Sequence, residues 1–152
     1  MFKLRKATQA DSATIRALVH AARINPTGLN WKRFLLAVDA QDVVIGCGQL
    51  KPHGKNICEL ASIAVQPAWR GQGVARTIIE NLLKENETGR CELFLTCRAA
   101  LEPFYMKFGF EIARGKLPGY FSWVGFLTRI LKILGLTRQV ILVMHYRSGG
   151  ST

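Results

Sequence analysis

The spacing of apolar residues at the start of the chain predicts a strand followed by a helix. Residues 2–7 alternate between apolar and polar side chains, as a half-buried strand does. Residues 8–23 then place apolar side chains three and four positions apart, which is the period of a helix with one buried stripe. Thr8 and Asp11 have the spacing of a capping box at the start of that helix. The expected stripe consists of Ile15, Leu18, Val19 and Ala22.

A loop and three strands are expected next. Asn-Pro and Thr-Gly pairs within residues 24–33 predict a loop, or a loop with one short helical turn. The strands are expected at 34–40, 43–51 and 57–66, separated by the turn sequences AQD and KPHGKN. Two of these strands are almost continuously apolar, which indicates central strands that are covered on both faces.

The second half of the chain begins with a change from the period of a strand to that of a helix, over residues 73–87. The buried face of this helix is expected to be Val74, Ile78, Ile79, Leu82 and Leu83. Further elements are expected as a strand at 91–97, a short helix at 100–108 and strands at 109–114 and 139–147. This order of elements predicts a mixed α+β fold in which helices cover a mostly antiparallel sheet.

Length and composition predict one globular domain over residues 1–147 and a disordered tail at 148–152. Twenty-one Lys and Arg against ten Asp and Glu give a net charge of +11. Such a charge favours nucleic acid, an anionic membrane surface, or an anionic substrate or cofactor. Nucleic acid is not favoured, because basic and aromatic residues do not alternate on one exposed strand face.

The cysteines and the N-terminus concern the cellular compartment. The four cysteines have no metal-binding spacing, so we expect no metal site and small reduced core residues. The first residues contain no signal-peptide segment, and no apolar run reaches about 18 residues. We therefore expect a protein of the cytoplasm or of an organelle stroma, neither secreted nor membrane-spanning.

The most informative segment is VQPAWRGQGVAR, residues 65–76, which lies between an expected strand and an expected helix. Glycines at such a junction let backbone N–H groups approach an anion at the helix N-terminus. Arg70 and Arg76 add positive charge on either side. The spacing differs from that of a P-loop and from that of a dinucleotide-binding loop. We therefore expect a pyrophosphate site of another kind.

Two segments resemble the GNAT superfamily of acetyl-CoA-dependent N-acetyltransferases. Residues 70–75, RGQGVA, are similar to the acetyl-CoA motif of that family, and FYMKFGFE at 104–111 is similar to its late motif. The resemblance covers about residues 2–114 and 139–147. It implies a twisted sheet of six to seven strands with helices on both faces, and a fourth and fifth strand that splay apart. It also implies transfer of an acetyl group from acetyl-CoA to a primary amine.

Site residues follow from this resemblance. Tyr105 is the expected acid at the leaving thiolate, and Glu59 is the expected base, with ordered water as the alternative. Cys97-Arg98 stand where the family often has an asparagine, which puts that side-chain contact with the cofactor in doubt. Contacts with the pantetheine arm are expected from Ile63, Ala64 and Val65, and contacts with the pyrophosphate from Arg70, Gly71, Gln72, Gly73, Val74, Ala75 and Arg76.

The unmatched insert, residues 116–137, predicts a strongly apolar helix. Trp123, Phe126, Leu127, Ile130, Leu131 and Leu134 lie on one face, opposite a narrow stripe of Gly125, Arg129 and Lys132. Three interpretations are open: packing on the domain beside the acceptor site, a homodimer contact, or peripheral membrane contact through residues 120–134. Trp123, Phe126 and Ile130 are expected to be buried against the domain or against a partner chain. The resemblance implies a protein or small-molecule amine as the acceptor, and a non-catalytic CoA-binding or basic-surface module is the alternative function.

Overall fold

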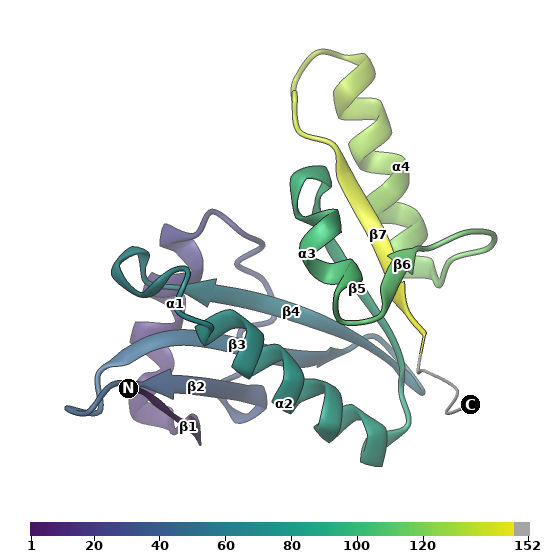
Figure 1. Ribbon diagram of the computed structural model, residues 1–152. Coiled ribbons are helices and arrows are strands. Elements are labelled where there is room, and N and C mark those ends of the chain that lie inside the picture. The colour runs from purple at the N-terminus through teal and green to yellow at the C-terminus, as the bar shows by residue number, and fades with distance from the viewer. Residues whose placement is uncertain (148–152) are drawn as a thin grey trace.

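Seven strands form one mixed sheet in the computed structural model, which describes residues 1–147 (Figure 1). The strand order is β1-β2-β3-β4-β5-β7-β6. The strands are β1 (Lys3–Lys6), β2 (Phe34–Val38), β3 (Val44–Pro52), β4 (Ile57–Val65), β5 (Glu92–Arg98), β6 (Phe110–Ile112) and β7 (Ile141–Tyr146). The helices are α1 (Ser12–Ala21), α2 (Val74–Gly89), α3 (Glu102–Met106) and α4 (Gly119–Ile133). The mixed α+β fold expected from the sequence is confirmed, whereas the expected tail lies outside the described residues.

Helices cover both faces of the sheet because its central strands are apolar on both sides. In β2, Leu35 and Ala37 pack in the core beneath α2, whereas Phe34, Leu36 and Val38 pack beneath α1. The expected face of α2 is buried along its full length. In α1 only Ile15 and Val19 are fully buried, and the first turn of the expected helix is a 3-10 turn over Gln9–Asp11.

The two halves of the sheet separate between β4 and β5. These neighbours run parallel and pair only from Ile57–Glu92 to Glu59–Phe94. Beyond Glu59 the two strands diverge, and Figure 1 shows β4 crossing the lower half of the molecule while β5 rises with β7 into the upper half. The expected splay of the fourth and fifth strands is confirmed. It leaves one edge of β4 without a strand partner over residues 60–65.

Asp11 links the start of α1 to β1. Its carboxylate accepts hydrogen bonds from the Thr8 amide at 2.7 Å and the Thr8 hydroxyl at 3.0 Å, which confirms the capping box. Arg5 donates two further bonds, at 2.8 and 3.0 Å. The Arg5 guanidinium therefore holds the pKa of Asp11 well below its usual value, against the opposing effect of burial.

Asp11→Asn is expected to lower the free energy of unfolding by about 1–2 kcal/mol at pH 7, because it removes a charged cap and an ion pair. A carboxyl whose pKa is lowered in the folded state stabilises the fold above its unfolded pKa of about 3.9, and this stabilisation is lost as the pH falls further. The difference between the proteins should therefore narrow toward pH 3. Urea unfolding at pH 7 and pH 3 measures this difference in the free energy of unfolding.

Asp42→Asn is the control, because it removes the more exposed carboxylate partner of Arg5 and should lower the free energy of unfolding by less. Equal stabilities of wild type and Asp11→Asn at pH 7 would show that the Asp11 carboxylate does not stabilise the fold as a cap and ion-pair partner.

Candidate functional site

The opening between β4 and β5 forms one end of a continuous cleft. A cavity of about 420 Å³ lies in this opening, and a second cavity, of about 600 Å³, lies against the glycine loop. The two cavities share five lining residues: Ile63, Val65, Arg70, Leu101 and Tyr105. Because these residues border both cavities, a long ligand can extend from the loop into the opening.

The glycine loop presents unpaired backbone amides to the cleft. Gly71 and Gly73 have φ angles of 76° and 81°, which strain most other residues. An added Cβ would meet no atom within 4 Å at either glycine, so the loop faces open space. The first backbone bond of α2 runs from the Thr77 amide to the Gly73 carbonyl, and the helix itself therefore leaves the amides of 74–76 without partners. This arrangement suits an anion at a helix N-terminus.

Side chains of the loop divide between the cavity and the loop itself. Arg70 and Arg76 line the cavity on either side of the glycines. The side-chain amide of Gln72 instead donates to the Ala68 carbonyl at 3.0 Å, and Gln72 is not among the residues that line the cavity. The Gln72 side chain is therefore held within the loop and does not point into the cavity.

A bulge in β4 brings its free edge into the cleft. Ser62 has a φ of 58°, and the pairing with β3 shifts by one residue beside it. The Gln49 side chain holds the bulge by donating to the Ser62 hydroxyl at 2.9 Å. After the bulge, Ile63, Ala64 and Val65 line the opening on the side that β5 leaves unpaired. The backbone of these three residues can pair with an extended ligand as a strand would.

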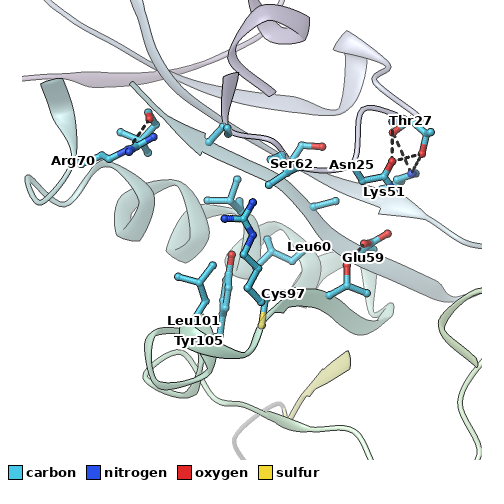
Figure 2. A pocket seen from close by; sticks show the side chains of 18 residues that line it. Asn25, Thr27, Lys51, Glu59, Leu60, Ser62, Arg70, Cys97, Leu101 and Tyr105 are labelled. Atoms are coloured by element: carbon cyan, nitrogen blue, oxygen red, sulfur yellow. Dashed lines mark hydrogen bonds between the residues drawn. The ribbon is translucent and has the colours of Figure 1, made fainter. Parts of the chain in front are cut away.

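Tyr105 lies where the two cavities meet. Its side chain projects from α3 toward β4 (Figure 2), and the residue is 8% exposed. No group within residues 1–147 hydrogen-bonds to its hydroxyl. Burial, with a smaller contribution from nearby Cys97, raises the pKa of Tyr105 above its ordinary value. The hydroxyl therefore stays protonated at neutral pH and can donate to an atom in the cleft.

Glu59 lies at the opposite side of the opening, where the pairing of β4 with β5 ends (Figure 2). It is 4% exposed, and its carboxylate contacts two side chains. His53 Nε2 lies 2.5 Å from one carboxylate oxygen, and the Thr96 hydroxyl donates to the other at 3.4 Å. Glu59 can accept a proton within the cleft, and His53 is placed to share it.

This end of the cleft also contains residues that were not predicted from the sequence. Asn25 and Lys51 line it, and His53 stacks on Tyr120 with ring centroids 4.0 Å apart. Tyr120 also accepts a hydrogen bond from Asn25 at 3.3 Å. The β3–β4 hairpin could have indicated His53, because it returns the chain to Glu59 within six residues. No sequence signal places Tyr120, since it belongs to the insert.

The end of β5 differs from the family pattern in its chemistry. Arg98 lines the opening and donates to the Arg23 carbonyl at 3.3 Å, which ties β5 to the loop after α1. Cys97 lines the same opening, and burial together with the negative charge of Glu102 raises the pKa of its thiol to about 11. A thiol of this kind is protonated at neutral pH, so Cys97 is not an activated nucleophile.

The insert forms the predicted helix, but most of its expected apolar face does not pack on the domain. Phe121 is fully buried against Phe94 of β5 and Val143 of β7. Trp123 and Phe126, expected to be buried, are 60% and 62% exposed, and Ile130 is only partly buried. The cause is helical phase, because Phe121 and Trp123 point about 200° apart around a helix axis. Once Phe121 faces the sheet, Trp123 must face outward.

A sequence profile of the acetyltransferase (GNAT) domain matches residues 30–112. That segment includes β4, the glycine loop, Glu59 and Tyr105. No protein with a curated description matches the sequence significantly.

Solved structures with the same fold include several acetyltransferases. The Mycobacterium tuberculosis protein Rv2747, solved in complex with CoA, has a TM-score of 0.71 and 21% identity, over 95% of this chain and 98% of the other. The ribosomal-protein-S18-alanine N-acetyltransferase of Escherichia coli has a TM-score of 0.67 and 17% identity, over 100% and 97%. The N-acetylglutamate synthase of Neisseria gonorrhoeae, solved with CoA and N-acetyl-glutamate, has a TM-score of 0.70 and 18% identity, over 97% of this chain and 35% of the longer one. The TM-scores of 0.67 to 0.71 show that these proteins share the fold of this chain.

Proposed function

The chain belongs to the GNAT acetyltransferase family, and we propose that it transfers an acetyl group from acetyl-CoA to a primary amine by direct attack in a ternary complex. The amine is a protein N-terminus, a lysine or a small molecule. The observation that carries the proposal is one cleft that joins an anion-binding loop, a free strand edge, a protonated tyrosine and a carboxylate.

The loop and β4 would hold acetyl-CoA, which supplies a thioester carbonyl that an amine can attack. The amides of residues 71–76 would donate to the pyrophosphate, and Arg70 and Arg76 would supply positive charge beside it. Ile63, Ala64 and Val65 would pair through backbone with the pantetheine arm. The residues present therefore fit this cofactor, because the loop combines open space, free amides and two cations at a helix N-terminus.

Glu59 and Tyr105 would handle the protons of the reaction. An ammonium group must lose a proton before it can attack, and Glu59 would accept it directly or through water. As the new C–N bond forms and the C–S bond breaks, negative charge develops on sulfur. Tyr105 would donate its hydroxyl proton to that sulfur, and the second proton that the nitrogen loses as the amide forms would restore the tyrosine hydroxyl through water. No bond to the protein is required, because positioning and proton transfer suffice for a neutral amine.

The cysteines support a reducing compartment. Cys47, Cys58, Cys91 and Cys97 are all free thiols. Burial raises the pKa of Cys47 and of Cys58 to about 12, so both are unreactive core residues. We place the reaction in a reducing compartment such as the cytoplasm or an organelle stroma.

Release of free CoA from acetyl-CoA tests the proposed function. The purified protein is assayed against peptides with free N-termini, lysine peptides, amino acids and polyamines. At least one amine should raise CoA release above the rate of acetyl-CoA hydrolysis, and mass spectrometry should find that amine acetylated. A protein that binds CoA yet accelerates CoA release with none of these amines would instead be a non-catalytic CoA-binding module.

Gly73→Asp is expected to weaken CoA binding by at least about 30-fold, or about 2 kcal/mol. The substitution places a Cβ and a negative charge where the phosphates would approach the start of α2. Isothermal titration with CoA measures the effect.

Two further variants separate charge from backbone strain in this titration. Gly73→Asn adds an uncharged side chain of similar shape and should weaken binding less. Gly115→Asp provides the matched control, since Gly115 has a φ of 82° and open space around it but lies between β6 and α4. An unchanged dissociation constant in a folded Gly73→Asp protein would rule out the loop as the pyrophosphate site.

A further inference from the structure

Helix α4 exposes a broad apolar face to solvent. Its outward residues, which we call the α4 apolar face, are Trp123, Phe126, Ile130, Ile133 and Leu134. Ile133 is 84% exposed and Leu134 is 63% exposed, and Leu136 just beyond the helix is 71% exposed. These residues recur at helical spacing, so they form one continuous strip. An exposed apolar strip of this kind is typical of a surface that contacts a protein or a membrane.

The helix is anchored to the domain by a different side. Phe121 fills the core between β5 and β7, and Tyr120 stacks on His53. Figure 1 shows α4 beside β7 at the outer end of the upper half of the molecule. The α4 apolar face is therefore held outward by packing on its opposite side.

The charged side chains in the segment of the chain that contains this face are all positive. Residues 112–152 contain six Lys or Arg and no Asp or Glu, which is more than half of the net charge of +11. Within residues 1–147, no carboxylate pairs with Arg114, Lys116, Arg129, Lys132 or Arg138. Arg129 and Lys132 also line a hollow of about 390 Å³ between α4 and the β6–β7 end of the sheet.

We propose that α4 binds the surface of a membrane that contains anionic lipids. The apolar face would enter the boundary between head groups and acyl chains, and the positive charge of residues 112–147 would attract the anionic surface electrostatically. Trp123 near the start of the helix suits this boundary, because its ring is amphipathic. A helix of 15 residues is about 22 Å long, and no helix in residues 1–147 meets the length and hydrophobicity needed to cross a bilayer. The helix therefore lies along the surface.

Charge favours lipid over a second copy of the chain. A two-fold interface would place the α4 apolar face of one copy against the same face of its partner. Each copy would then bring the net positive charge of its residues 112–147 toward that of its partner, and neither segment contains a carboxylate to offset this charge. An anionic lipid surface complements both the apolar strip and its cations, and this contact is independent of acetyl transfer.

Co-sedimentation with vesicles tests the proposal. The full chain should pellet with vesicles of mixed phosphatidylglycerol and phosphatidylcholine, and much less with phosphatidylcholine alone. Raising the salt from about 0.05 to 0.5 M should release most of the protein, because the Debye length falls several-fold. Emission of Trp123 should shift to shorter wavelength on binding.

Two sets of variants separate the apolar and the electrostatic contributions. Trp123→Ser with Phe126→Ser should lower the partition coefficient at least about tenfold, and so should Arg129→Gln with Lys132→Gln. Val43→Ser with Met106→Ser is the control, because both side chains are nearly as exposed but do not belong to α4. All variants should keep wild-type CoA binding, which reports that they are folded.

Two results would overturn the proposal. The first is a failure of wild type to pellet with anionic vesicles at low salt. The second is concentration-dependent dimerisation in analytical ultracentrifugation that the Trp123→Ser, Phe126→Ser protein loses, combined with vesicle binding that it retains. That second result would assign the α4 apolar face to a partner chain. Neither result depends on whether the protein acetylates an amine.

Discussion

Tyr105→Phe is expected to lower the rate of acetyl transfer about 10²-fold while CoA binding stays nearly unchanged. The substitution keeps the ring that packs against Phe104 and Phe110 and removes only the hydroxyl. That hydroxyl is protonated and lies where both cavities meet, so its loss removes a donor at the leaving sulfur. Single-turnover kinetics with an accepted amine measures the chemical step directly.

Tyr146→Phe is the matched control for this experiment. Tyr146 belongs to the same apolar core, packs on Phe110 with ring centroids 5.2 Å apart, and does not line the cleft. The rate of acetyl transfer by Tyr146→Phe should equal that of wild type.

The pKa of Tyr105 lies above the ordinary value of 10, so deprotonation of its hydroxyl should not lower the rate below about pH 10. A Tyr105→Phe protein with the wild-type single-turnover rate would reduce Tyr105 to a packing residue.

Glu59→Gln should lower kcat/KM about 10²-fold at neutral pH and leave CoA affinity unchanged. The amide preserves the shape of the side chain beside His53 and Thr96 but cannot accept a proton from an ammonium group. Raising the pH should reduce the deficit, because a larger fraction of the amine is then neutral without assistance. Initial rates of CoA release as a function of pH measure both effects.

Glu92→Gln is the control for the loss of a carboxylate. Glu92 lies on β5 at the other end of its pairing with β4, is exposed, and does not line the cleft. It should leave kcat/KM unchanged. Equal pH profiles of Glu59→Gln and wild type would show that ordered water accepts the proton.

Local sequence patterns were sufficient for most of the fold. The apolar period of α2, from Val74 to Leu83, matches its buried face residue for residue, because a helix packed on a sheet needs one continuous apolar stripe. The capping box of Thr8 and Asp11 forms as expected, since its bonds span three residues. The glycine loop adopts its positive φ angles for the same local reason.

Contacts between residues far apart in the chain could not be predicted from the sequence. The stacking of His53 on Tyr120 joins residues 67 positions apart through the path of the insert, and no local pattern encodes that path. The outward position of Trp123 and Phe126 has the same origin. Hydrophobic periodicity identifies an apolar face, but it does not say whether that face turns toward the sheet or away from it.

The sequence by itself therefore determined the order of elements, the position of the glycine loop and the family, because each depends on residues that are close together in the chain. The tertiary structure alone decided how β4 and β5 separate, how Glu59 meets His53, and which side of α4 is anchored. Phe121 settled the last point, because one large side chain buried between β5 and β7 fixes the rotation of the whole helix. That rotation leaves the remaining apolar residues of α4 facing solvent.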